Sequence, residues 1–243
     1  MHAARAVVLL YSLYVSVSAF PATSGAAEPA AQPPPKQAVK LNNDGVYWVK
    51  RERVLKSAPG KNATPGEQCG FLMAAWTAEA NMRHYDKAEG YARQLVKLRP
   101  DDPLAHSGLS VFLGKQGKLK EAEEAARTSL QLDPSWIHGK LVLASWVWLE
   151  GRKEEALKLV GSVAEPDDEA WKGLYFGCLA CFHASVGDED KIQAYIKQTR
   201  ELDPKNMSFF ERDIVFDPYR GKDWFIKLVG KTLAEPDDAT GGK

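Results

Sequence analysis

The residues of this sequence with the clearest chemical potential are Cys178 and Cys181, with His183 close behind them. A Cys-x-x-Cys spacing is typical of redox and zinc sites. A redox pair needs its first cysteine at a helix N-terminus and zinc needs further ligands, whereas this pair lies in the middle of a predicted helix. Because cysteine often fills small spaces in a core, we interpret these as packing residues. A thiol, metal or small-ligand module built on Cys178, Cys181 and His183 is the alternative function.

The other residues that could do chemistry lack the partners that such chemistry needs. Cys69 lies far from the cysteine pair in the sequence, and no disulfide is expected between them. His106 and His138 each stand near the start of a predicted helix, where we expect partial exposure, but neither has a carboxylate partner for acid–base catalysis. The sequence contains no phosphate-binding loop, dinucleotide fingerprint or Gly-x-Ser-x-Gly elbow. These observations predict a protein that is not an enzyme and that holds no metal or cofactor.

The composition is that of a protein with a substantial core and a balanced surface. The 243 residues include 32 basic and 32 acidic side chains, and 44% of the residues are hydrophobic. A formal net charge of zero disfavours nucleic acid as the main ligand, because duplex binding depends on Lys and Arg side chains that neutralise phosphates. We therefore expect no nucleic-acid partner.

The first residues follow the pattern of a secretory signal peptide. Arg5 precedes an apolar run from Ala6 to Val17, and small residues follow it. Residues 1–27 are predicted to be the signal peptide, which places the mature protein in the periplasm or outside the cell. The run is short for a transmembrane helix, so no integral membrane span is expected after cleavage. Retention of Val7–Val17 as a membrane tether is an alternative.

Two segments separate the signal peptide from the periodic part of the sequence. Residues 28–45 include Pro33-Pro34-Pro35 and are predicted to be an extended linker, because proline fixes φ and has no amide donor. Residues 46–68 show no clear periodicity and are predicted to form an N-terminal extension before the periodic part.

The rest of the sequence is periodic. Ala88, Ala122 and Ala156 recur at a spacing of 34 residues, each at the end of a similar segment. The aligned segments are Arg83–Ala88, Gly117–Ala122 and Gly151–Ala156, with Gly187–Ile192 as a fourth copy that ends in isoleucine. Leu98-Arg99-Pro100 and Leu132-Asp133-Pro134 repeat at the same spacing, and Leu202-Asp203-Pro204 lies two periods and two residues further on. The acidic segment from Ala164 to Asp168 is predicted to be a longer turn that holds the extra residues.

Each copy predicts two amphipathic helices joined by a turn. Gly117, Gly151 and Gly187 supply the backbone freedom that a helix end needs. Prolines 100, 134 and 204 end the second helix, and the recurring alanines allow the two helices to pack closely. One such unit cannot bury its apolar face alone, so the units are expected to stack on one another.

The Gly-Lys-x-x-Glu-Ala turn, the Leu-x-Leu-Asp-Pro ending and the period together resemble the tetratricopeptide-repeat (TPR) family. The resemblance covers residues 69–206, although Trp76 stands where the family has a small residue. Residues 207–233 resemble the short unit that caps many bacterial TPR arrays, and residues 234–243 are predicted to be a disordered tail. The resemblance implies an all-α solenoid of about four helix-turn-helix units with C-terminal capping helices.

The TPR resemblance also implies a function, which is to bind a protein or peptide partner as an extracytoplasmic scaffold or adaptor. In this fold the first helix of each unit lines a concave face. The residues that this geometry places there, which we call the concave strip, are Met73, Leu104, Val111, Leu141, Trp148, Leu149 and Leu174. The strip is apolar, which is typical of an interaction surface, and the indole of Trp148 is the expected anchor.

Two further expectations concern how the concave strip is used. The chain itself is an alternative occupant, with Tyr47, Trp48 and Val49 as a candidate plug. Some TPR domains grip the C-terminal carboxylate of a peptide with basic and amide side chains, and this mode is not expected here. The matching positions, none of which can supply that clamp, are Met73, Thr77, Gly108, His138 and Val142.

Overall fold

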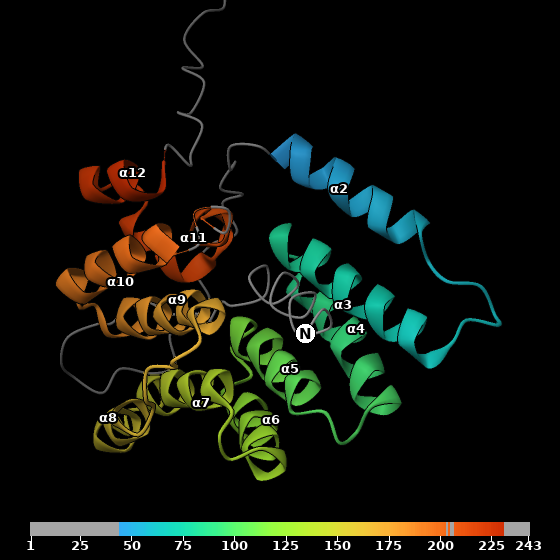
Figure 1. Cartoon of the computed structure of the whole chain (residues 1–243), viewed down its shortest axis with the longest axis horizontal. Helices are drawn as coiled ribbons and strands as arrows, with labels where there is room; N and C mark the ends of the chain where they lie inside the picture. Colours follow the sequence, from blue (N-terminus) through green and yellow to red (C-terminus); the bar gives the residue numbers. More distant parts are fainter. Residues whose placement is uncertain (1–43, 203, 205–206, 231–243) are drawn as a thin grey trace, which may run out of the picture.

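The computed structural model describes residues 44–202, 204 and 207–230, and all of its regular structure there is helical (Figure 1). The predicted all-α class is therefore confirmed for these residues. The predicted signal peptide, the predicted tail and nearly all of the predicted linker lie outside the described residues. No helix in the described ranges is long and apolar enough to cross a membrane.

The elements follow one another with short connections. In chain order they are α2 (Asp44–Lys56), α3 (Pro65–Asn81), α4 (Tyr85–Leu98), α5 (Pro103–Lys115), α6 (Leu119–Leu132), α7 (Ile137–Leu149), α8 (Lys153–Gly161), α9 (Glu169–Val186), α10 (Glu189–Leu202), α11 (Ser208–Arg212), the 3₁₀ helix η2 (Ile214–Tyr219) and α12 (Asp223–Val229). Four helical hairpins, α3–α4, α5–α6, α7–α8 and α9–α10, are called the first to fourth hairpins below. The elements α11, η2 and α12 form the C-terminal cap.

The hairpins pack in sequence order and follow an arc. Each helix packs against its hairpin partner, and α5, α7 and α9 also pack against one another in succession. In Figure 1 the arc runs from α2 and α3 through α5–α8 to α9 and α10, and α11 then comes to face α3 across the interior. The two ends of the described chain therefore return toward each other.

The turn inside each hairpin has one backbone geometry. Gly117, Gly151 and Gly187 have φ of 79°, 85° and 88°, as the sequence predicted from their place at a helix end. The amide after each glycine bonds back to the preceding helix, for example Lys118 N to Leu113 O at 3.1 Å. In the first hairpin Arg83 occupies the equivalent position with φ 59°, and His84 N bonds to Glu79 O at 2.9 Å. Left-handed backbone costs a side-chain-bearing residue about 1–2 kcal/mol, so the first turn keeps the shared geometry despite its sequence.

The predicted helix ends are also found. Helices α4 and α6 end at Leu98 and Leu132, two residues before a proline, and α10 ends at Leu202 in the same way. Helix α8 ends early at Gly161, and the chain runs without a helix to Asp168. This is the longer acidic turn that the extra residues predicted.

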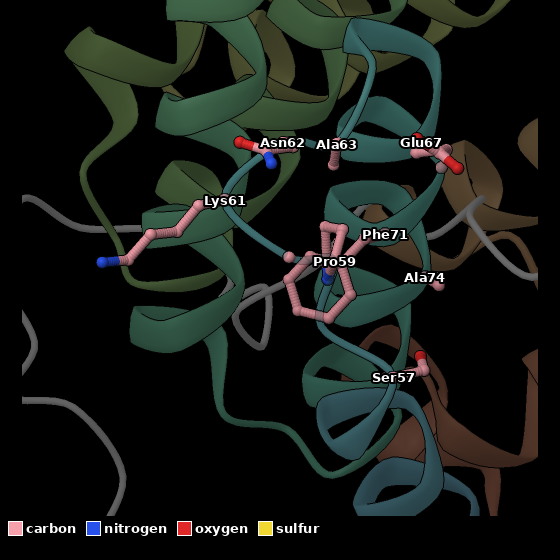
Figure 2. A pocket seen from close by; sticks show the side chains of 10 residues that line it. Ser57, Pro59, Lys61, Asn62, Ala63, Glu67, Phe71 and Ala74 are labelled. Atoms are coloured by element: carbon pink, nitrogen blue, oxygen red, sulfur yellow. The ribbon is translucent and has the colours of Figure 1, made fainter.

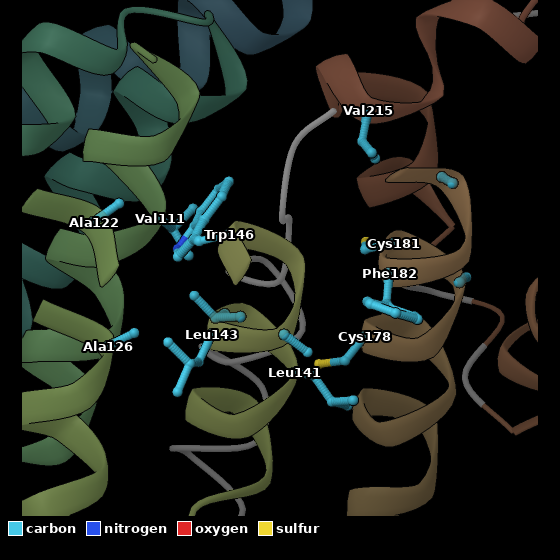
Figure 3. Close-up of a cluster of buried hydrophobic side chains, with 14 of the residues drawn as sticks. Val111, Ala122, Ala126, Leu141, Leu143, Trp146, Cys178, Cys181, Phe182 and Val215 are labelled. Carbon is cyan, nitrogen blue, oxygen red and sulfur yellow. The ribbon is translucent and has the colours of Figure 1, made fainter. Parts of the chain in front are cut away.

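The recurring small residues lie in the core. Ala88, Ala122 and Ala156 are fully buried, and so is Ile192, which takes their place in the fourth hairpin. Figure 3 shows side chains from α5, α6, α7, α9 and η2 gathered in one buried cluster. Close packing of each hairpin therefore has the cause that the sequence indicated.

The segment before the first hairpin is more regular than the sequence suggested. The predicted extension, residues 46–68, contains most of α2 and the start of α3. Thr64 and Glu67 form a reciprocal capping box, with Pro65 in the first turn, so α3 begins at Pro65 rather than near Cys69. Helix α2 mixes apolar and charged residues on all of its faces and is tied to α3 by Arg51, whose Nε lies 2.9 Å from Glu79 Oε2. Such a helix lacks the apolar period that reveals amphipathic helices.

Candidate binding surface

The structure divides the concave strip by exposure. Leu104, Val111 and Leu141 are only 8%, 1% and 1% exposed, so they lie within the core. The other four members, Met73, Trp148, Leu149 and Leu174, are half-buried. Only this second group presents area to a partner in the described conformation.

Trp148, the expected anchor, lies between neighbouring hairpins. Its indole meets the ring of Phe182 edge-on at a centroid distance of 6.1 Å. Lys153 Nζ lies 5.4 Å from the indole centroid, within the range of a cation–π contact. The indole therefore combines a packing role between α7 and α9 with a half-exposed face.

The C-terminal cap covers part of the interior. Phe210, Val215, Phe216 and Phe225 are fully buried, and η2, which carries Val215, packs on α9. The cap packs on α9 and α10.

The candidate plug near the N-terminus lies elsewhere. Tyr47, Trp48 and Val49 belong to α2, which packs on α3. Val49 is 57% exposed, so its side chain does not fill the strip. The side chains of Tyr47 and Trp48 lie outside the described part of the chain.

Charged side chains join the cap to the first hairpin. The Arg83 guanidinium makes a two-pronged contact with Asp217, with NH1 to Oδ2 at 2.9 Å and NH2 to Oδ1 at 2.7 Å. Its Nε also donates to the carbonyl of Arg212 at 3.2 Å. Arg212 in turn donates through Nε to the carbonyl of Asn81, at the end of α3, at 2.7 Å. We call this contact between the first hairpin and the cap the seam. Arg83 reaches across it to the cap, and Arg212 reaches back to the first hairpin.

A buried ion pair lies deeper in the interior, between the second hairpin and the cap. Lys115 Nζ is 2.5 Å from Asp213 Oδ1, and neither side chain has exposed area. Burial lowers the pKa of Lys115 and raises the pKa of Asp213, while the charge of each opposes the effect on the other. Asp213 Oδ1 also accepts from the amide of Val215 at 2.9 Å, so the carboxylate both caps η2 and pairs with the lysine.

One surface pocket lies between α3 and the connection that joins α2 to it (Figure 2). Its volume is about 720 Å³, and its wall is formed by the connection after α2 and by one face of α3. The lining residues are Ser57, Pro59, Gly60, Lys61, Asn62, Ala63, Glu67, Gly70, Phe71 and Ala74. No member of the concave strip lines this pocket.

A second pocket reaches the concave strip at Leu174. It has a volume of about 300 Å³ and lies where α7 and α9 begin, between the indoles of Trp136 and Trp171. The remaining lining residues are Asp133, Ser135, Ile137, His138 and Pro166. Sequence reasoning missed both indoles, because they stand in or beside the connections and outside the first-helix positions that carried the prediction.

His138 corrects one expectation, because it is buried and only 1% exposed. Its Nδ1 lies 3.3 Å from Ser107 Oγ, which also accepts from Trp136 Nε1 at 3.3 Å. Burial lowers the pKa of His138 to about 3, so the imidazole is neutral at ordinary pH. The side chain therefore acts as part of the pocket wall.

The cysteine and histidine residues pack in α9. Cys178 and Cys181 are 1% and 0% exposed, and all three cysteines of the chain are free thiols. Burial raises the pKa of Cys178, which disfavours the reactive thiolate. His183 lies between the rings of Phe182 and Tyr195, and burial lowers its pKa to about 4. No group of three or more potential metal ligands occurs among the described residues.

No family model matches this sequence, and none of the curated proteins matches it.

Proposed function

We propose that this chain is an exported helical-repeat scaffold of the TPR type, which binds a protein or peptide partner along the surface formed by α3, α5, α7 and α9. The observation that carries the proposal is the recurrence of one hairpin turn, with a residue of positive φ at Arg83, Gly117, Gly151 and Gly187, at spacings of 34, 34 and 36 residues. Stacked helical hairpins form continuous surfaces that serve as binding sites. The periplasmic or secreted location rests on the N-terminal sequence pattern alone.

The part-exposed members of the concave strip are the proposed contact residues. Trp148 and Leu149 end α7, and Leu174 adds the wall of the Trp136–Trp171 pocket. Aromatic side chains beside an apolar pocket are typical of the centres of binding sites. Nothing in the geometry of Cys178, Cys181 and His183 favours the thiol or metal alternative over this one.

The test is capture of the native partner by variants of the full exported protein. After a partner is co-purified from the native envelope, Trp148→Ala is expected to weaken its binding by tenfold or more, because truncation at the centre of an interface costs about 2 kcal/mol or more. Leu157→Ala is the control, because Leu157 is 53% exposed on α8, outside the strip. Native affinity in the Trp148 variant would show that another surface binds the partner.

A further inference from the structure

The first hairpin turn carries an arginine where the other three hairpin turns carry a glycine. Arg83 is the one side-chain-bearing residue with positive φ in the described part of the chain, and the three equivalent turns all use glycine. A glycine there would form the same turn without backbone strain. The arginine therefore has to be explained by its side chain.

That side chain reaches a segment 134 residues away in the sequence. Both terminal nitrogens of Arg83 bond to the Asp217 carboxylate, and its third nitrogen bonds to the backbone beside Asp213. Arg212 makes the reverse connection to the last carbonyl of α3, which lacks a partner within its own helix. The seam between the first hairpin and the cap is thus held by two arginines with defined targets.

The cap is fixed differently on its other side. The ring of Phe209 lies over Gly177, and the Tyr219 hydroxyl donates to the carbonyl of Ala184 at 3.0 Å. Lys222 Nζ lies 2.6 Å from Glu189 Oε1, which ties the start of α12 to α10. Helix packing joins the cap to α9 and α10, and no comparable packing joins its described elements to α3, α4 or α5. The charged contacts that join the cap to the earlier hairpins are those of Arg83 and Arg212 with the first hairpin and the buried pair of Asp213 with Lys115 of α5. The cap therefore stays with the fourth hairpin when these charged contacts separate.

We propose that Arg83 and Asp217 are a latch that holds the helix array closed, and that its opening uncovers the apolar interior between the first hairpin and the cap. Interfaces that are small and polar permit relative motion, whereas large apolar ones do not. Opening gives a partner access to apolar surface of the interior that the closed form buries. This last consequence rests on the proposed function, but the latch itself does not.

The experiment measures the distance across the seam in the full mature chain by pulsed electron paramagnetic resonance. Spin labels are attached at Asp86→Cys and Asp223→Cys, which are exposed positions on α4 and α12, in a Cys69→Ser background. Arg83→Gly removes the guanidinium and gives the turn its unstrained residue. The expected result is a shift of the distance distribution to longer values, beyond the width seen with Arg83 present. Arg93→Gln is the matched control and should leave the distribution unchanged, because Arg93 pairs only with Glu89 and Glu121 among the ion pairs described.

An unchanged distribution in folded Arg83→Gly would overturn the latch. If circular dichroism shows that this variant does not fold, Asp217→Asn tests the same contact from the cap side without altering the turn. Asp217 Oδ1 also accepts from Arg220 Nε at 2.7 Å within the cap, and an unchanged distribution in this variant overturns the latch equally. Binding of an apolar fluorescent dye is expected to rise severalfold when the distance lengthens. A longer distance without added dye binding would overturn the claim that the latch covers apolar surface. Neither readout uses a partner, so failure of the Trp148 test is a separate result.

Discussion

At the scale of single residues, the least expected feature is the ion pair of Lys115 and Asp213 in the interior. Removing two charges from water costs several kcal/mol per ion, and the mutual attraction repays this only with good geometry and additional hydrogen bonds. Here the lysine lies 2.5 Å from Asp213 Oδ1, which also caps η2 through the amide of Val215. The pair therefore specifies where the cap sits more than it adds stability.

Breaking the pair from one side is expected to be costly. Lys115→Met leaves a buried carboxylate without a cation, and the free energy of unfolding should fall by about 3–5 kcal/mol in urea denaturation. The double variant Lys115→Met/Asp213→Asn should recover most of the loss, because no unpaired charge remains and the amide oxygen can still cap η2. Lys118→Met, which removes the half-exposed partner of Glu89, is the control and should cost about 0–1 kcal/mol.

The stability of the Lys115→Met variant should depend on pH through Asp213. Burial raises the pKa of Asp213, and loss of Lys115 removes a charge that lowers it, so the folded pKa rises further above the unfolded value of about 3.9. The folded state then binds a proton at a pH where the unfolded state has released it. Stability from this proton is complete below the unfolded pKa and is lost as the pH rises through the folded pKa. The deficit of Lys115→Met should shrink as the pH falls from 7 toward 4, and a constant deficit would show that the carboxylate is not the cause.

At the scale of helices, the packing of α5 against α7 depends on a glycine, Gly114, which leaves room for a large side chain. The indole of Trp146 is fully buried against Gly114, and its Nε1 donates to Ser110 Oγ at 2.8 Å. A Cβ at Gly114 would lie 2.2 Å from an indole carbon, which is too close for any real contact. The glycine therefore sets how closely the second and third hairpins approach.

Gly114→Ala is expected to lower the free energy of unfolding by about 1–3 kcal/mol, because the buried indole is fixed by its hydrogen bond and cannot move aside freely. Gly90→Ala is the matched control. Gly90 lies within α4 with open space around it, so alanine there should raise stability by about 0.5–1 kcal/mol through helix propensity. Thermal and urea unfolding of both variants measure the difference, and equal effects would refute the role of the indole.

The sequence predicted much at this scale and missed what has no local signal. Turn glycines, proline-limited helix ends and buried alanines follow from rules that act over a few residues, and the structure confirms them. Helix α2 was missed because its apolar residues follow no helical period, and its contact with α3 through Arg51 and Glu79 joins residues 28 positions apart. The close approach at Gly114 was also invisible, because the residue that fills its space, Trp146, lies on the next hairpin.

At the scale of the whole molecule, the array closes on itself. The closing contacts join residues that are 134 positions apart, such as Arg83 and Asp217, and no period or motif in the sequence links such positions. Sequence reasoning therefore predicted a cap on the fourth hairpin but not its contact with the first.

The contact between the cap and the first hairpin changes which helices lose stability when the cap is weakened. In an open helical array each unit contacts only its neighbours, so a weakened cap should affect α10 and α9 most and α3 least. Phe210→Ala removes a fully buried ring from the cap and should destabilise it by about 3–5 kcal/mol. Because Arg212 binds Asn81 at the end of α3 and Asp217 binds Arg83 in the turn that follows, hydrogen exchange should accelerate at Asn81–His84 as well as in α9 and α10, while α6 keeps its protection. A loss of protection that declines steadily from α10 to α3 would instead show that the seam carries no coupling between the two ends.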